Sequence, residues 1–385
     1  IKESFGVEDW QMGLLGGPAF AILYTFVGIP IARFSEKNHR VWIIAGSVAL
    51  WSLMTVLCGF ATSFIALFIF RIGVSIGEAG CSPPANSIIA DYFVPKERST
   101  AVSVYALGIP LGGMVAYVFG GFIVGNLDGA TIAAMFNSWN WTWAANALDW
   151  QNIEGWRVAF VVVGVPGIIV AMLVKMTIKE PPRGYTDPLE MQNKEQVGFR
   201  EVLRILSKKP AYWHVTIGVT VASFVNYGVG QFFVSFLIRT HELSIFDASV
   251  KVGLALAIMA SIGTYMSGFL ADKYAERFPK ALALIPMFAL LGVIPMHVVG
   301  YLAESLLLYT YLCPLYAVPS GVVDSRMRAT AVAVTLFIVN LLGYGLGPPL
   351  IGGLSTILNA TFLSGLDPAL TLEACKASNL AVAAQ

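Results

Sequence analysis

The sequence has few charged residues, and two common enzyme motifs are missing from it. Only 12% of its 385 residues are charged and its mean hydropathy is +0.72, which a soluble domain of this length could not carry on its surface. No P-loop is present, and His241-Glu242 is not followed by the second histidine of an H-E-x-x-H zinc motif. These absences disfavour a membrane enzyme, and we expect neither catalysis nor a cofactor.

Cysteine is scarce as well. The four cysteines, Cys58, Cys81, Cys313 and Cys375, are scattered without paired spacing and lie mostly in apolar runs. This pattern indicates neither a disulfide framework nor a zinc site. We interpret them as small core residues and expect no metal site. We also expect no nucleic-acid partner.

Long apolar runs dominate the chain instead. About 20 apolar residues cross a bilayer as a helix, and this rule predicts about ten spans in an all-α polytopic membrane protein. Most of the 24 Lys and Arg residues fall in or beside five of the connecting loops, which the positive-inside rule therefore places in the cytoplasm. The predicted spans are 12–32, 41–62, 64–91, 98–125, 156–178, 211–238, 248–271, 281–303, 305–322 and 329–352. The predicted cytoplasmic loops are 33–40, 92–97, 179–210, 272–280 and 323–328.

The long polar loop 179–210 divides the chain into two halves. We expect an N-terminal helical bundle at 1–178 and a C-terminal helical bundle at 211–385, with this loop as the linker. Residues 199–206 of the linker form a short amphipathic segment, which we expect to lie as a helix on the membrane surface.

The two halves contain an internal repeat. Residues 28–33 resemble residues 268–273, and residues 98–104 match residues 328–334. A duplicated bundle of helices with a central linker is typical of membrane transporters.

Several short motifs accompany the repeat. The loop motif G-x-x-x-D-[RK] occupies 268–273, and Arg71 is followed in the same span by Gly77-Glu78-Ala79. The others are Gly13-Leu-Leu-Gly16 with Ala19-Phe20, Ile89 to Phe93, Gly155-Trp156-Arg157 with Phe160, Gly164 and Pro166-Gly167, Lys179-Glu180-Pro181 with Arg183-Gly184, and Arg326 to Ala331. Together they resemble the major facilitator superfamily and, within it, most closely the Spinster family, exporters of lysophospholipids and sphingosine phosphate. The chain is similar to a bacterial member.

The resemblance implies a major facilitator fold of two six-helix bundles. The spans found here correspond to helices two to eleven, so we expect the first and twelfth helices to be missing. In the Spinster family the first helix resembles a proton-switch element with its own acidic and basic pair. The family's first loop motif also carries an aspartate that holds the cytoplasmic gate shut. Ala32 occupies that position here, whereas the second copy keeps Asp272.

Arg71 and Glu78 lie inside an apolar span, where charged side chains are costly and mark transport pathways. Both point to one helix face, but at ~1.5 Å per residue they are about 10 Å apart along the axis. We therefore expect no direct ion pair, and a partner for each on another helix. Burial favours a neutral carboxyl group and a nearby arginine favours a charged one, so Glu78 could couple proton flow to conformational change. The alternatives are a static charge pair, or Arg71 as an anchor for an anionic head group.

Other polar residues predict a cavity and a gate. Polar side chains in a span normally point toward protein or water, and here they either line a cavity or hydrogen-bond between helices. The candidate cavity residues of the C-terminal half are Asn226, Tyr227, Gln231, Phe233, Asn340 and Tyr344. The candidate residues of a cytoplasmic gate are Arg33, Asp91, Glu97, Arg98, Asp272, Lys273 and Arg328.

The two halves of the expected cavity differ in polarity. The N-terminal half offers Arg71 and Glu78, and the C-terminal spans are rich in phenylalanine, which together suit an amphiphile with a charged head and an acyl tail. We predict a proton-coupled secondary transporter of a lysophospholipid or sphingosine-phosphate-like lipid that works by alternating access. The alternative is proton-coupled transport of a small organic anion or drug-like solute. The phenylalanines of the C-terminal spans are Phe232, Phe233, Phe236, Phe269 and Phe337.

We expect the protein to be a monomer, surrounded by membrane lipids, in the cell membrane. If the source is Gram-negative, this is the inner membrane.

Overall fold

Every regular element that the computed structural model describes is a helix. It describes residues 1–7, 18–126, 129–146, 153–186, 197–241, 253–275, 277–278, 281, 284–291, 309–347 and 350. The elements of the N-terminal half are α1 (Lys2–Phe5), α3 (Pro18–Ser35), α4 (Arg40–Gly59), α5 (Phe64–Ala79), α6 (Ser82–Tyr92), α7 (Arg98–Ala106), α8 (Gly108–Asn126), α9 (Gly129–Ser138), α10 (Thr142–Ala145) and α11 (Gly155–Thr177). Those of the C-terminal half are α13 (Phe199–Ser207), α14 (Pro210–His241), α16 (Gly253–Ala275), η3 (Tyr309–Tyr311), α19 (Leu312–Gly321), η4 (Ser325–Met327), α20 (Arg328–Ile338) and η5 (Val339–Tyr344).

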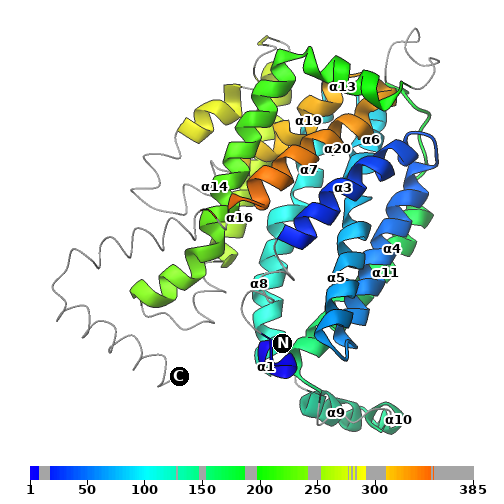
Figure 1. Cartoon of the computed structure of the whole chain (residues 1–385), viewed down its shortest axis with the longest axis vertical. Coiled ribbons are helices and arrows are strands. Elements are labelled where there is room, and N and C mark those ends of the chain that lie inside the picture. Colours follow the sequence, from blue (N-terminus) through cyan, green and yellow to red (C-terminus); the bar gives the residue numbers. More distant parts are fainter. Residues whose placement is uncertain are drawn as a thin grey trace, which may run out of the picture.

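The all-α membrane fold expected from the sequence is confirmed. Five helical stretches in the described part of the chain are long and apolar enough to cross a membrane: Arg40–Gly59, Phe64–Tyr92, Arg98–Ala116, Gly155–Thr177 and Ser325–Tyr344. Helices α4, α5 and α11 run side by side along the long axis (Figure 1). The two halves of the chain meet where α16 packs on α7 and α8, and where α20 packs on α3 and α6.

The span predicted at 64–91 is not one regular helix. Helix α5 ends at Ala79 and α6 begins at Ser82, with a turn between them. Pro83 and Pro84 cause the break, because neither has an N–H to donate to a carbonyl of the preceding turn, whereas both are tolerated in the first turn of a new helix. The break places the last turn of α5 and the first turn of α6 next to each other in the middle of the bundle.

Glycine sets the spacing between α4 and α5. A Cβ atom at Gly77 would lie 2.7 Å from the backbone nitrogen of Trp51 and 3.0 Å from the carbonyl oxygen of Ser47. These neighbours are backbone atoms of α4, so they cannot rotate out of the way. The close approach of the two helices therefore requires glycine at this position.

Substituting Gly77→Ala should destabilise the protein measurably. We expect a loss of about 1–3 kcal/mol, the usual cost of overpacking, seen as a lower thermal unfolding temperature in detergent. Gly46→Ala on α4 is the matched control, because a Cβ there meets no atom within 4 Å and alanine is the better helix former by about 1 kcal/mol. Equal behaviour of the two variants would contradict the close-packing argument.

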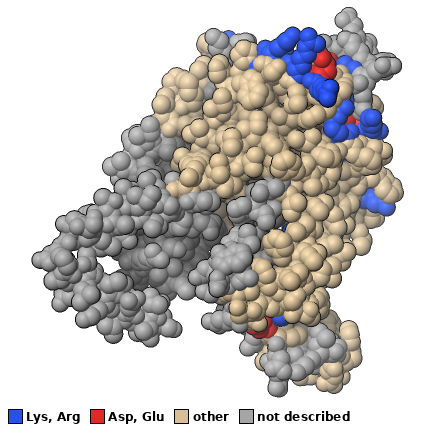
Figure 2. All heavy atoms as spheres, in the orientation of Figure 1, with Lys and Arg blue, Asp and Glu red and all other residues tan. Residues whose placement is uncertain are grey.

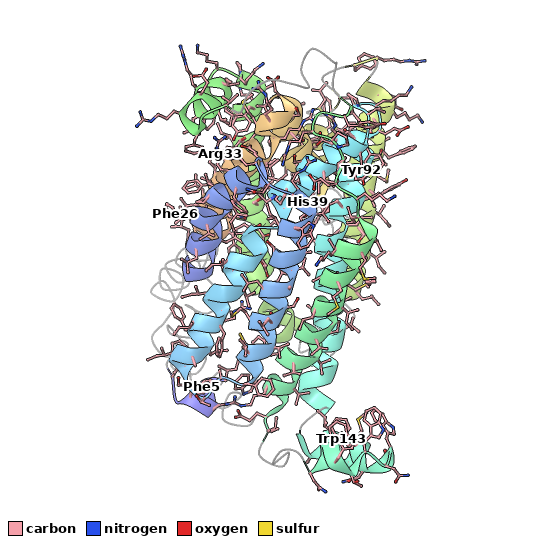
Figure 3. The ribbon with its side chains drawn as sticks, turned by 90° about the vertical axis from the view of Figure 1, so that its right-hand side faces the viewer. Phe5, Phe26, Arg33, His39, Tyr92 and Trp143 are labelled. Carbon is pink, nitrogen blue, oxygen red and sulfur yellow. The ribbon has the colours of Figure 1, made fainter. Side chains whose placement is uncertain are left out.

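Basic side chains gather at one end of the molecule, which we call the basic end. Figure 2 shows most of the visible Lys and Arg residues there. In Figure 3, Arg33, His39 and Tyr92 lie at this end, and Phe5 and Trp143 lie at the other. The basic end carries the loops that the sequence predicts to be cytoplasmic.

Helix α13 of the linker does not lie free on a membrane surface, and that expectation is wrong for its apolar face. Val202 and Leu206 are 0% and 1% exposed and pack against Tyr212, Met327 and Ala331. The apolar stripe thus covers the basic ends of α14 and α20. The amphipathic pattern correctly predicts an apolar face on this helix, but that face is covered by protein rather than by lipid.

Candidate functional site

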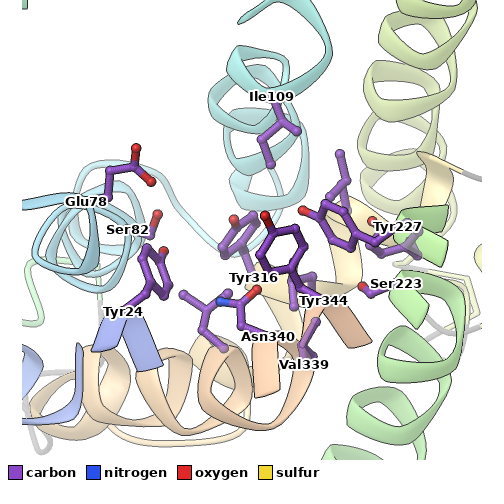
Figure 4. A pocket seen from close by; sticks show the side chains of 14 residues that line it. Tyr24, Glu78, Ser82, Ile109, Ser223, Tyr227, Tyr316, Val339, Asn340 and Tyr344 are labelled. Atoms are coloured by element: carbon purple, nitrogen blue, oxygen red, sulfur yellow. The ribbon is translucent and has the colours of Figure 1, made fainter. Parts of the chain in front are cut away.

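A cavity of about 260 Å³ lies between the two halves, in the middle of the bundle. Helices α3, α5, α6 and α8 contribute its N-terminal wall, and α14, η3, α19, α20 and η5 contribute its C-terminal wall. Figure 4 shows side chains from both walls pointing toward one another. The lining residues are Tyr24, Glu78, Ser82, Ile109, Ser223, Tyr227, Tyr311, Leu312, Leu315, Tyr316, Leu336, Val339, Asn340 and Tyr344.

Glu78 is the one charged side chain among the described residues that line this cavity. It lies in the last turn of α5, and Ser82 at the start of α6 lines the same cavity, so the break between these helices positions both. Arg71 lies about two turns earlier on α5 and is not a lining residue. Its charge nevertheless acts on both Glu78 and Tyr344. Electrostatically, Arg71 and Glu78 belong to one site.

Tyrosine rather than phenylalanine dominates the wall of the C-terminal half. Tyr227 and Tyr344 meet edge to face with ring centroids 4.8 Å apart, and Tyr311 and Tyr316 complete this wall. The expected phenylalanine wall is wrong where it can be checked. Phe269 lies outside this cavity, facing a groove beside α7, and Phe337 packs edge to face on Phe26 at 5.3 Å. The side chains of Phe232, Phe233 and Phe236 lie outside the described residues.

The two candidate asparagines of the C-terminal half differ in position relative to the cavity. Asn340 lines the cavity, whereas the Asn226 amide donates to the Tyr311 hydroxyl over 3.4 Å and supports the wall from behind. Asn340 and Tyr344 lie on the π-helix η5, where the Gly345 N–H donates to the Asn340 carbonyl over 2.8 Å. Such π-helical turns are frequent at functional sites. The side chain of Gln231 lies outside the described residues.

Residues 73–77 have the letters of a hydrolase motif, G-x-S-x-G. That motif requires a sharp turn between a strand and a helix that exposes the serine. Here the segment lies inside α5, and Ser75 is 0% exposed. The serine therefore has neither the backbone geometry nor the access of a nucleophile.

Asp91 is the centre of a buried charge cluster at the basic end. Its two carboxylate oxygens accept from Arg40 at 2.5 Å and from Arg328 at 3.0 Å, and all three residues are at most 3% exposed. The Gly184 N–H also donates to Asp91, and Glu180 pairs with Arg40 at 2.6 Å. Because Arg328 comes from the C-terminal half, the cluster ties the two bundles and the start of the linker together.

The other gate candidates differ in what they contact. Asp272 joins the halves, because its carboxylate accepts from the backbone N–H groups of Ser99 at 3.1 Å and Thr100 at 2.6 Å. Arg98 donates to the Ala90 carbonyl in its own half and to Thr186 in the linker. Three more lie at this end in other settings: Arg33 pairs with Glu36, Lys273 lies near the rings of Phe269 and Tyr274, and Glu97 lines the groove beside α7.

The sequence interpretation missed Arg40, Glu180 and the additional cavity tyrosines. Arg40 stands in a polar loop among other charges, so its sequence setting gives no sign of burial. Glu180 belongs to the Lys179-Glu180-Pro181 motif that carries the family resemblance, and that motif was the available signal. Tyr24, Tyr311 and Tyr316 lie in apolar runs where tyrosine is ordinary.

The chain belongs to the Major Facilitator Superfamily, whose family model matches residues 1–348. An "MFS-type efflux pump" of Mycolicibacterium smegmatis is 30% identical over 93% of this chain and 79% of that protein. "Protein spinster" of Drosophila melanogaster is 26% identical over 99% of this chain but 62% of its own length. "Protein spinster homolog 1" of Homo sapiens is 23% identical over 92% of this chain and 68% of the human protein.

A solved structure shows the same relationship. The crystal structure of a bacterial homologue of the human lysosomal transporter Spinster, in an inward-facing and unoccupied conformation, is 40% identical. The match covers 98% of this chain and 80% of the chain in that crystal structure, with a TM-score of 0.69. The resemblance to Spinster proteins is therefore confirmed, and the protein is a multi-pass membrane transporter of this superfamily.

Proposed function

We propose that this protein is a proton-coupled transporter of an amphiphilic lipid, of the lysophospholipid or sphingosine-phosphate type, that works by alternating access. One observation carries the proposal: among the described residues, the cavity shared by both halves has one carboxyl group, and an ion pair and hydrogen bonds between the halves hold the basic end together. The basic end is cytoplasmic in this proposal. Opening that end and closing the other would carry a bound molecule across the membrane.

A groove on the flank of the molecule supports an amphiphile as substrate. It has a volume of about 770 Å³ and lies between α7 and α16 near the basic end. Val104, Tyr265 and Phe269 give it an apolar wall, and its polar rim has two lysines and two carboxylates, Lys96, Lys273, Glu97 and Asp272. An acyl tail suits the wall, and a polar head group suits the charged rim.

Tyr105 lies between this groove and residues of the central cavity. It lines the groove, and its hydroxyl donates to Ser82 of the cavity over 3.2 Å. Its ring also meets the cavity residue Tyr316 edge to face, with centroids 6.0 Å apart. In this proposal, movement of this side chain opens a route for a lipid from the groove to the cavity.

Proton coupling is assigned to Glu78. Burial in the cavity favours the neutral form of the Glu78 carboxyl group, and the charge of Arg71 favours the ionised form. Opening either side of the cavity to water changes the balance between these two effects. The group can then bind a proton from one side of the membrane and release it to the other. Arg71 serves this exchange by its charge, and it can also attract an anionic head group.

Transport of labelled lysophospholipid in proteoliposomes tests the substrate class. With a pH gradient imposed, we expect protein-dependent transport well above that of empty vesicles, and competition by unlabelled lysolipid. Short phosphates without a tail should not compete. Transport no greater than in empty vesicles would reject the lipid, and competition by the tail-free anions would favour the small organic anion instead.

A further inference from the structure

A helical hairpin projects from the end of the molecule opposite to the basic end. It consists of α9, α10 and the turn between them, residues 129–145, and we call it the aromatic hairpin. The Gly129 N–H donates to the Ile153 carbonyl oxygen over 3.1 Å, which closes its base between α8 and α11. Figures 1 and 3 show it beyond the ends of α4 and α5. None of its described residues lines the central cavity or the groove beside α7.

The turn of the hairpin brings three aromatic rings together. Asn140 has a φ of 58°, in the left-handed region where asparagine is enriched, and the Trp141 N–H donates to the Phe136 carbonyl oxygen over 2.8 Å. The rings of Trp139 and Trp141 consequently meet with centroids 5.7 Å apart. Both also lie beside the Phe136 ring, at 6.4 and 6.1 Å. The local backbone geometry thus gathers the rings into one cluster.

The protein leaves this cluster largely uncovered. Trp139 and Trp141 are 53% and 50% exposed, and Trp143 on α10 is 75% exposed. Tryptophan is highly buried on average in soluble proteins, and a contiguous set of exposed apolar side chains marks an interaction surface. The rings therefore contact something other than the described residues of this chain.

Helix α9 has two different faces. Residues three or four positions apart share a face of a helix, so Ile132, Phe136 and Trp139 lie along one side. The opposite side presents small residues, among them Ala134 and Ser138, which are exposed. A helix with one strongly apolar face and one face of small residues suits a boundary between an apolar and an aqueous phase.

Position and charge identify that boundary as the membrane interface. The span Arg98–Ala116 leads into the hairpin through α8, and α11, which follows it, is itself a span. The outer face of α11 is apolar and exposed at Val163 and Ile169, as a lipid-facing surface is. Residues 126–155 contain no Lys or Arg, so the hairpin offers no cation to an acidic protein. Tryptophan is enriched where spans leave the bilayer, because its ring is apolar and its N–H is polar.

We propose that the aromatic hairpin docks on the bilayer, with the rings of Trp139, Trp141 and Trp143 inserted between the head groups and the acyl chains. The partner is the phospholipid surface itself at the end opposite to the basic end. Because both ends of the hairpin are joined to helices of the N-terminal half, docking holds this half at a fixed depth in the membrane. The depth of the hairpin can be measured without a substrate, so the proposal is independent of what the protein transports.

Spin labels on introduced cysteines measure this depth in phosphatidylcholine nanodiscs. The chain, with its native cysteines replaced, carries one label, either through Trp143→Cys or through Ala134→Cys on the face of α9 opposite to Phe136. Both positions are exposed, so the labels should leave the fold intact. Power saturation compares collisions with oxygen, which concentrates among acyl chains, and with a water-soluble nickel chelate. We expect the label at position 143 to lie about 5–10 Å into the boundary between head groups and acyl chains, and the label at position 134 to lie in water.

The same measurement distinguishes lipid from other partners. If the label at position 143 meets the nickel chelate as often as the label at position 134, the hairpin lies in water and the proposal is overturned. Protection of position 143 from both reagents would indicate a protein partner, such as a second copy of the chain, and would overturn it too.

Removal of the rings tests whether they hold the hairpin in the interface. With the label at position 143, we expect Trp139→Ser combined with Trp141→Ser to move the label toward water, because two of the three inserted rings are lost. Ala134→Ser, which changes the opposite face, is the matched control and should leave the depth unchanged. An unchanged depth in the double variant would show that the connections to α8 and α11 alone set the position, which would reject docking through the rings.

Discussion

Replacing Asp91 by alanine should lower the stability of the protein more than any other single change at the basic end. The substitution leaves the guanidinium groups of Arg40 and Arg328 buried without the carboxylate between them. Removing one partner of a buried ion pair typically costs about 3–5 kcal/mol, because an uncompensated charge remains. Glu180 still pairs with Arg40, and Arg328 keeps its hydrogen bond to the Ser320 carbonyl oxygen. Thermal or denaturant unfolding of the purified protein in detergent measures the loss.

Asp324→Ala is the matched control for Asp91→Ala. Asp324 also pairs with an arginine, Arg326 at 3.3 Å, but its side chain is 33% exposed. Ion pairs open to solvent contribute about 0–1 kcal/mol, so this variant should remain close to wild type. Similar losses for the two aspartates would show that the buried cluster has no special weight.

Substituting Glu78→Gln should reduce pH-driven transport to the level of empty vesicles while the protein still folds. Glutamine keeps the size and hydrogen-bonding capacity of the side chain but cannot exchange a proton, so the coupling proposed for the cavity is lost. The measurement is substrate flux in proteoliposomes as a function of an imposed pH gradient. Exchange without a gradient should persist, because the cavity keeps its shape.

Glu154→Gln provides the control for the loss of a carboxylate. Glu154 lies outside the membrane-spanning segments, just before α11, and a hydrogen bond from Ser4 lowers the pKa of its carboxyl group. The group stays ionised as pH falls until this lowered pKa is reached, so it does not titrate near neutral pH. The variant should keep wild-type pH dependence. If Glu78→Gln also kept it, Glu78 would be a static structural charge.

The sequence predicts the helical spans and the repeat well, because long apolar runs and matched loop motifs are local signals. It predicts Asp91 and Arg328 as gate candidates but cannot pair them, since they are far apart in the chain and their contact depends on how the halves dock. In the sequence, Arg40 and Glu36 cannot be distinguished from the exposed charged residues of the same loop. Only the packing of α20 against α3 and α6 shows that both are buried. The cavity tyrosines cannot be predicted for a similar reason, because a tyrosine in an apolar run looks like an ordinary residue of the hydrophobic core.

The linker is divided between the two bundles rather than lying between them. Its first part is fastened to the N-terminal half through Glu180, Gly184 and Thr186, and α13 is packed on the C-terminal half. Residues 187–196 then connect the part of the linker that is fastened to the N-terminal half with Val197, which packs on the C-terminal half. Ten residues reach about 35 Å when fully extended, which sets the largest separation of these two points in the alternating-access mechanism proposed above. A deletion of a few residues there should be tolerated until the tether becomes shorter than the open gap.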